Sequence, residues 1–396
     1  MSLVFDRRVK LAGQPMAHAL LVGVSEYLYL PPVTQPGNAR TFNLRRLGSS
    51  ALSAWEICRW LVAHADSLAC KLGTIRILMS PSEAELPVIK AIAQDPDGAW
   101  KNLLPTQIDP ALWDPFMTEA TEWRKDCATS NRDGLSFFYY SGHGLRRSGN
   151  DLVTLADFAK PMGGGKLKRT FELLSNFVAG MGPLADSPDI ARNQFYFADC
   201  CRENILDISY PDEVWEDTLC DYDDRTTPVF MAAYPGDRAM AIRGQTTDFC
   251  NALLECLENG TDGPTADDKW PITSFSLSNA LDYYFKSAGL GGASPCTGIN
   301  LGNVPLRWRA GPPEVDYTLM IQPPAAVEGT SVTVNYLDGV FERQFPATSP
   351  DHPYKIRSPA GVYKITATPT GPFQSYNKTK NISRLTPQIP IQLGSV

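Results

Sequence analysis

The sequence predicts an α/β domain, with a mostly parallel sheet flanked by helices, followed by a small all-β domain. Over residues 1–310, apolar runs of strand length alternate with amphipathic segments, which is the pattern of a parallel sheet covered by helices. The last 86 residues hold 12 of the 32 prolines and no cysteine, and they show no helical periodicity. We therefore predict a first domain over 1–310 and a second over 311–396.

The elements follow from short apolar and amphipathic segments. The predicted strands of the first domain are 19–24, 74–79, 135–140, 194–198, 228–233 and 304–308. Its predicted helices are 52–65, 111–127, 167–181, 247–257 and 277–286. In the second domain, β-branched and aromatic runs predict strands at 317–321, 331–336, 341–345 and 361–368. Asp338-Gly339 is typical of a hairpin turn, and together these features predict an Ig-like sandwich.

Composition narrows the class of protein. With 43% hydrophobic and 20% charged residues among 396, the chain has neither the composition of a disordered protein nor that of a coiled coil. A net charge of −7 without a dense basic stripe argues against nucleic acid as a partner. The apolar run at 16–24 is nine residues long, whereas a bilayer-spanning helix needs about 20. We expect a soluble, cytoplasmic protein without a membrane partner.

Cysteine and histidine spacing argues against a cofactor. The nine cysteines include no CxxC pair, so neither a disulfide framework nor a zinc site is predicted. The four histidines form no HExxH motif. Residues 202–225 carry nine acidic side chains, which leaves Ca²⁺ as a possible ligand, although the regular spacing of an EF-hand is absent. We expect no required cofactor and no other metal.

Two predicted strands end in reactive side chains. The strand at 135–140 runs into SGHG at 141–144, and the strand at 194–198 runs into DCCR at 199–202. Catalytic groups gather at the carboxyl ends of parallel strands, so neighbouring strands joined by the helix at 167–181 would bring His143 beside a cysteine.

This pairing suits nucleophilic catalysis. An imidazole takes the proton of a thiol and later protonates a leaving amine, and a neighbouring imidazolium lowers the pKa of the thiol. The backbone N–H groups of Gly144 and Cys201 could then face the oxyanion of a tetrahedral intermediate.

With these residues in place, the sequence resembles the caspase-like cysteine peptidases, which include caspases, metacaspases and bacterial homologues. The resemblance spans about residues 16–309. It is carried by ALLVGVSEY at 19–27, YSGHG at 140–144, DCCR at 199–202 and FMAAY at 230–234. The resemblance implies a caspase-like fold and a cysteine endopeptidase that acts on protein or peptide substrates.

The resemblance also implies roles for single residues. The nucleophile of the family stands one residue before Arg and two after an Asp or Gln, which selects Cys201 over Cys200 and makes His143 the general acid/base. A vicinal disulfide switch formed by Cys200 and Cys201 remains an alternative to peptide cleavage. Gly144 is the expected oxyanion donor.

Specificity is expected to depend on Asp199. In metacaspase-like members an acid at this position lines the pocket for the residue before the cut, which favours Arg or Lys through charge-assisted hydrogen bonds. Ser141 is a second candidate substrate-binding residue. Two alternatives stay open: the arginines at positions 40, 45 and 46 form a pocket for Asp, or Asp199 is a structural partner of Arg202.

The family further implies regulation. Such a bacterial protease would be held inactive until an activating protease or regulator acts, as part of a stress or defence pathway. Arg225, in the acidic segment, and Arg169, in the crossover loop, are the candidate processing sites.

A different class of function is a catalytically inactive caspase-like scaffold, in which the β domain binds a partner. Such a scaffold would be expected to lack the catalytic Cys or His, and both are present here.

Overall fold

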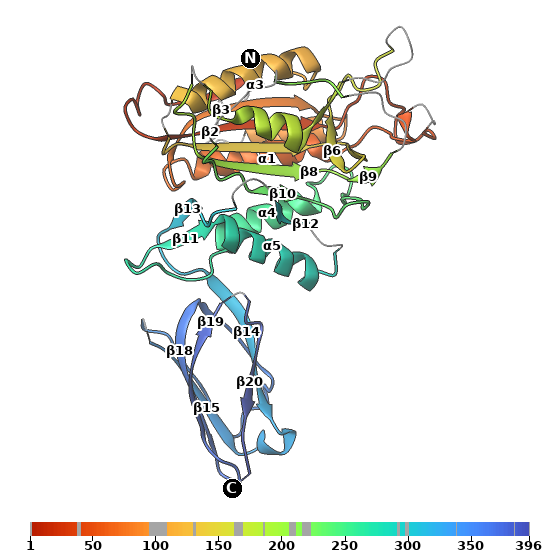
Figure 1. Cartoon of the computed structure of the whole chain (residues 1–396). Helices are drawn as coiled ribbons and strands as arrows, with labels where there is room; N and C mark the ends of the chain where they lie inside the picture. Colours follow the sequence, from red (N-terminus) through yellow and green to blue (C-terminus); the bar gives the residue numbers. More distant parts are fainter. Residues whose placement is uncertain are drawn as a thin grey trace. The chain divides into compact units, whose positions relative to one another are not determined.

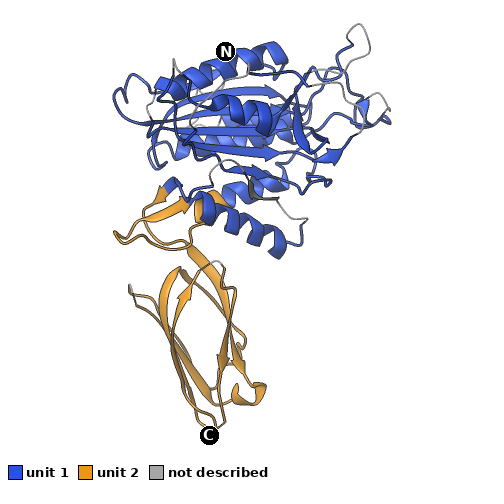
Figure 2. Cartoon of the chain, viewed as in Figure 1, with its two compact units in different colours: residues 1–255, 273–307 blue, residues 256–272, 308–396 orange. Residues whose placement is uncertain are grey.

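The chain folds into two compact units. The structure, a computed structural model (Figure 1), describes residues 2–37, 41–94, 109–129, 132–161, 169–184, 187–205, 211–215, 223–290, 294–297, 301–337, 339–383 and 385–395. Unit 1 comprises residues 1–255 and 273–307, and unit 2 comprises residues 256–272 and 308–396 (Figure 2). No helix in these described ranges is long and apolar enough to cross a membrane.

Unit 1 contains a seven-stranded sheet with the order β1-β3-β2-β4-β8-β10-β12. The five inner strands are parallel to one another: β3 Lys71–Ser80, β2 Met16–Val24, β4 Leu135–Ser141, β8 Asn193–Asp199 and β10 Val229–Met231. The edge strands β1 Leu3–Asp6 and β12 Ser294–Thr297 are antiparallel to theirs. The predicted mixed α/β class, with parallel strands, is confirmed.

Helices cover both faces of this sheet. The described helices are α1 Ser50–Ala63, α2 Glu85–Ala93, α3 Trp113–Thr129, α4 Asp248–Asn259 and α5 Ser274–Ser287, of which α1 and α3 contact β2 and β3. Alternate side chains of a strand point to opposite faces. On β2, Val22 and Val24 pack in the same core cluster as Trp123 of α3. Gly23 faces α1, where a Cβ would lie 2.7 Å from the Cα of Ala51. Gly23 therefore lets α1 lie directly on the sheet.

Two segments of unit 1 differ from the prediction, the first in its pairing and the second in its secondary structure. The strand at 304–308 exists as β13 Pro305–Arg309, but it pairs with β11 Trp270–Thr273 in a separate two-stranded sheet. The edge position of the main sheet belongs to β12, whose sequence SPCT has no apolar run to predict it. An edge strand pairs on one side only and so needs less apolar surface than an inner strand.

The segment predicted as a helix at 167–181 is the second. Its described part contains β7 Thr170–Glu172, a π-helical turn at Leu173–Val178 and a 3₁₀ turn at Ala179–Met181. Arginine side chains bind the carbonyls that an α-helix end would leave open: Arg225 donates to the Val178 carbonyl, and Arg124 donates to the carbonyls of Gly180 and Gly182. These side-chain bonds stabilise tight turns in place of a regular helix.

A small sheet follows the two reactive strand ends. Its order is β7-β6-β5-β9, with β5 Gly144–Arg147, β6 Asn150–Thr154 and β9 Glu203–Asn204. β5 and β9 are parallel, and they continue directly from the histidine and cysteine motifs. The buried guanidinium of Arg202 binds both carboxylate oxygens of Asp151 on β6, at 2.8 and 2.6 Å. This ion pair holds the cysteine loop against the small sheet.

Unit 2 contains two sheets around one apolar core. One has the order β17-β14-β20, with β17 Tyr354–Pro359, β14 Glu314–Gln322 and β20 Gln388–Gln392. The other has the order β16-β15-β18-β19, with β16 Glu342–Phe345, β15 Thr330–Tyr336, β18 Gly361–Pro369 and β19 Tyr376–Ile382. Strands occur at each of the four predicted runs. Asp338 of the predicted turn lies outside the described residues.

Candidate functional site

The two reactive motifs meet at one edge of the main sheet. β4 and β8 are parallel neighbours, and their last residues, Ser141 and Asp199, lie opposite each other. A cleft of about 520 Å³ opens there, and His143, Asp199 and Cys201 all line it. Residues 42–50 and 238–241 also line it. The predicted side-by-side placement of His143 and a cysteine is therefore present, although the connection between β4 and β8 is not a regular helix.

A backbone carbonyl fixes the tautomer of His143. The imidazole is buried, and its Nε2 lies 2.6 Å from the carbonyl oxygen of Arg45. Because a carbonyl only accepts hydrogen bonds, Nε2 must carry the proton, and Nδ1 keeps its lone pair. Burial lowers the pKa of His143 to about 4, so the ring is a neutral base at physiological pH.

Tyr27 holds the histidine loop in place. Its hydroxyl accepts a hydrogen bond of 2.8 Å from the backbone N–H of His143, and the two rings lie 4.9 Å apart. The same hydroxyl lies 3.1 Å from the hydroxyl of Thr154 on β6. Tyr27 is completely buried, so these contacts are shielded from water.

Cys201 is partly exposed at the cleft, whereas Cys200 is buried. The Cys201 sulfur lies 4.0 Å from the carbonyl oxygen of Ala239, and no hydrogen bond joins it to His143 in the described chain. Burial raises the pKa of the Cys201 thiol. The expected lowering by an imidazolium is wrong for this conformation, because His143 is itself neutral.

Gly144 brings the histidine and cysteine loops into contact. A Cβ at this position would lie 2.2 Å from the Cys201 carbonyl oxygen and 2.5 Å from the Cys200 sulfur. No side chain fits in this space, so glycine is required for the close approach of the two loops. The expected oxyanion donor thus lies directly beside the candidate nucleophile.

Asp199 is a buried carboxylate with an uneven set of partners. Its Oδ2 accepts hydrogen bonds from the hydroxyls of Tyr139 at 2.7 Å, Ser141 at 3.1 Å and Thr247. Its Oδ1 is buried and has no hydrogen-bond partner in the described part of the chain. Burial, opposed by the three hydroxyls, raises the pKa of Asp199 to about 6.

Ser141 and Arg202 have other roles than those considered from sequence. Ser141 is completely buried and reaches the cleft only through Asp199, so it positions that carboxylate. Arg202 pairs with Asp151, and the alternative in which Asp199 is its structural partner is wrong.

The arginines of the cleft are mostly engaged elsewhere. Arg45 donates to the Val33 carbonyl, and Arg46 pairs with Glu26. Arg40 lies outside the described residues. Arg243 also lines the cleft, with its side chain against Gly48. The guanidinium groups of Arg45 and Arg46 are therefore bound to other partners and do not form a joint pocket for an Asp side chain.

The two candidate processing sites are not freely exposed. Arg225 is 1% exposed, donates to the Val178 carbonyl and to Gln194, and pairs with Asp223. Arg169 is partly buried against the ring of Trp113. Both side chains hold the fold together here, and a protease would reach them only after local opening.

Two groups of the site lie outside the motifs read from the sequence. Tyr139 belongs to an apolar strand, and its hydroxyl gives no local signal of a role. Thr247 precedes α4, and its hydroxyl accepts from the N–H of Cys250 as a helix N-cap does. Threonine is a common N-cap residue, but the bond of this one to Asp199 depends on tertiary packing.

No cluster of three or more His, Cys, Asp or Glu side chains that could hold a metal occurs among the residues described. Much of the acidic segment at 202–225 lies outside them, so the Ca²⁺ hypothesis stays a prediction.

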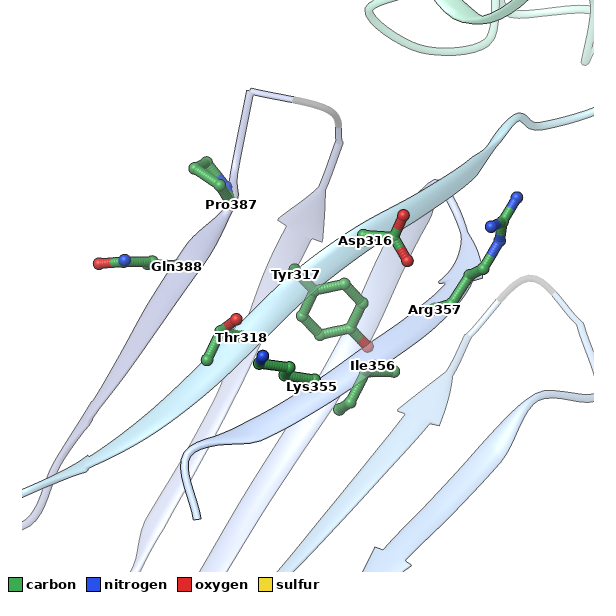
Figure 3. A pocket seen from close by; sticks show the side chains of 8 residues that line it. All are labelled: Asp316, Tyr317, Thr318, Lys355, Ile356, Arg357, Pro387 and Gln388. Atoms are coloured by element: carbon green, nitrogen blue, oxygen red, sulfur yellow. The ribbon is translucent and has the colours of Figure 1, made fainter. Parts of the chain in front are cut away.

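Unit 2 has a cavity of its own, of about 510 Å³ (Figure 3). It lies over β14 and β17, where the exposed side chains of Asp316, Lys355 and Arg357 surround it. Asp316 and Arg357 are cross-strand partners, as are Thr318 and Lys355. The lining has charges of both signs and no thiol or imidazole.

Comparison of the chain with models of known protein families and with curated proteins found no match.

Proposed function

We propose that unit 1 is a caspase-like cysteine endopeptidase that cleaves after Lys or Arg. The observation that carries the proposal is the shared cleft, in which a partly exposed cysteine, a neutral histidine and a buried carboxylate lie at the ends of β4 and β8. A peptidase with a basic preference needs these three groups: a nucleophile, a base and a negative charge for the substrate side chain. Unit 2 is proposed as an Ig-like accessory domain.

Cys201 is the nucleophile and His143 the general acid/base in this proposal. The thiol turns from the Ala239 carbonyl toward the imidazole, Nδ1 takes its proton, and the sulfur attacks the carbonyl carbon of the scissile amide. When the C–N bond breaks, His143 returns the proton to the leaving amine. A water molecule then hydrolyses the thioester, again with His143 as base, and the thiol is regenerated.

The raised pKa of Cys201 and the lowered pKa of His143 indicate how the thiolate arises. A preformed thiolate–imidazolium pair is disfavoured in the empty cleft, because burial penalises both charges. The proton transfer therefore accompanies attack on the bound substrate, and the backbone N–H groups of Gly144 and Cys201 stabilise the oxyanion that forms.

Asp199 selects the residue before the cut. Its unpaired Oδ1 offers a charge-assisted hydrogen bond to a cationic side chain. The alternative preference for Asp has less support, because Arg45 and Arg46 are bound to other partners.

The test is hydrolysis of fluorogenic peptides that end in Lys, Arg or Asp by the purified full chain. Cys201→Ala and His143→Ala should each abolish cleavage, and Cys200→Ala serves as the matched control that retains it. Cleavage after Asp would overturn the specificity alone. Cleavage that survives in Cys201→Ala would overturn the mechanism, and a wild-type protein that cuts none of the peptides would favour the scaffold function.

A further inference from the structure

The hydroxyl groups around Asp199 are concentrated on one of its two oxygens. Tyr139 comes from β4, Ser141 ends the same strand, and Thr247 precedes α4, yet all three donate to Oδ2. Oδ1 receives no donor within the described chain, although it is buried in a residue that lines the cleft. Within the described residues, Oδ2 of the carboxylate thus has three donors and Oδ1 has none.

This arrangement is held rigidly. The Thr247 hydroxyl also accepts hydrogen bonds from Ser53 of α1 and from the backbone of Cys250 in α4. The backbone N–H of Thr247 donates to Ser53 at 3.0 Å. Tyr139 and Ser141 are fixed by the central strand β4, and both are completely buried. A bound side chain cannot displace these donors without disturbing two helices and the sheet.

The number of free lone pairs limits what the carboxylate can bind. Each carboxylate oxygen has about two lone-pair sites, so three donors fill Oδ2. A guanidinium gains its advantage over an ammonium by binding both oxygens of a carboxylate through two parallel N–H bonds. That geometry needs a free site on each oxygen, and Asp199 has free sites only on Oδ1.

We propose that the cleft prefers Lys over Arg as the residue before the cut. The inference rests on the proposed peptidase function and refines its substrate class. An ammonium is a point charge with three donors, and it binds a single oxygen without loss of geometry. A guanidinium brings five donors into the same pocket and leaves more of them unpaired, which costs affinity when the site is buried.

The test compares two fluorogenic peptides that differ only in Lys or Arg at the position before the cut. For the wild-type full chain, we expect kcat/KM for the Lys peptide to be about tenfold higher, the cost of one unpaired buried donor. The proposed role of Asp199 also predicts that Asp199→Asn loses cleavage of both peptides. If it does, and the Lys-to-Arg ratio of kcat/KM for the wild type is one or less, the inference is refuted and the peptidase function is left intact. Cleavage of neither peptide would instead contradict the proposed function.

Variants of the hydroxyl donors make the test specific. Ser141→Ala combined with Thr247→Val leaves Tyr139 as the donor to Oδ2 and opens a site for the second N–H of Arg. The Lys-to-Arg ratio should then fall to about one or below. Thr247→Ser keeps the hydroxyl and should keep the wild-type ratio. An unchanged ratio in the double variant, with a native unfolding transition in urea, would show that Oδ2 saturation does not set the preference.

Discussion

Replacement of Asp199 by Asn should make the folded protein more stable at neutral pH. The carboxylate is completely buried, and the pKa of Asp199 is raised from 3.8 to about 6. This rise in pKa corresponds to roughly 3 kcal/mol of free energy against the ionised form in the folded state. The amide of Asn can accept the hydroxyl bonds made to Oδ2 and carries no charge, so the variant avoids that penalty.

The sign follows from proton linkage. Between pH 3.8 and about 6 the folded protein binds a proton at Asp199 that the unfolded chain has released, so this contribution to stability is present at low pH and is lost as pH rises through the window. Relative to wild type, the free energy of unfolding of Asp199→Asn should therefore be larger at pH 7.5 than at pH 4 by about 2 kcal/mol, which means that the variant is stabilised more at the higher pH.

Urea unfolding followed by tryptophan fluorescence measures this double difference. Effects of the substitution that do not depend on pH, such as altered packing, cancel between the two conditions. Asp316→Asn, which makes the same chemical change at an exposed carboxylate of unit 2, is the matched control. If Asp199→Asn gives equal differences at pH 4 and 7.5, the reasoning from burial is refuted.

Three further substitutions probe the scaffold of the cleft. Tyr27→Phe leaves the N–H of His143 buried without its acceptor. We expect a lower kcat and, in urea unfolding, a free energy of unfolding lower by about 1–3 kcal/mol. Unchanged stability would contradict this contact. Arg225→Gln removes a buried guanidinium from its ion pair with Asp223 and its bond to the Val178 carbonyl, and it should lower the free energy of unfolding by about 3 kcal/mol. A decrease of less than about 1 kcal/mol would indicate that the side chain is exposed instead. Gly144→Ala places a Cβ against the Cys201 carbonyl and should reduce kcat for peptide hydrolysis at least about tenfold. An unchanged kcat would show that the histidine and cysteine loops can move apart without loss of activity.

The parallel strands were predictable because burial on both faces leaves a continuous apolar run. β2 and β4 are buried along their whole length, and no other segment type combines that length and composition with the turn signals that follow. The edge strand β12 escaped prediction for the opposite reason, since an edge needs little apolar sequence. The segment 170–181 shows a third case: its turns depend on Arg124 and Arg225, which come from elsewhere in the chain.

The candidate site also has contacts that the sequence predicts and contacts that it does not. His143 and Cys201 could be placed together from sequence because each ends a buried strand, and the sheet then fixes their proximity. The carbonyl of Arg45, which sets the tautomer of His143, has no side-chain signal at all. Tyr139 and Thr247 belong to distant segments, so their shared contact with Asp199 arises only from the packing of β4 against α4 and its preceding loop.

The energetics of Asp199 support the specificity role that we propose for it. A buried carboxylate that only supported the fold would be expected to have both oxygens paired, because an unpaired buried polar atom costs stability. Three hydroxyls from two distant segments are instead used on Oδ2, and Oδ1 is left without a donor at the cleft. A neutral side chain would relieve the cost of about 3 kcal/mol that corresponds to its raised pKa. A residue that costs stability in the free protein, and regains it when a cation binds, has the properties expected of a specificity determinant.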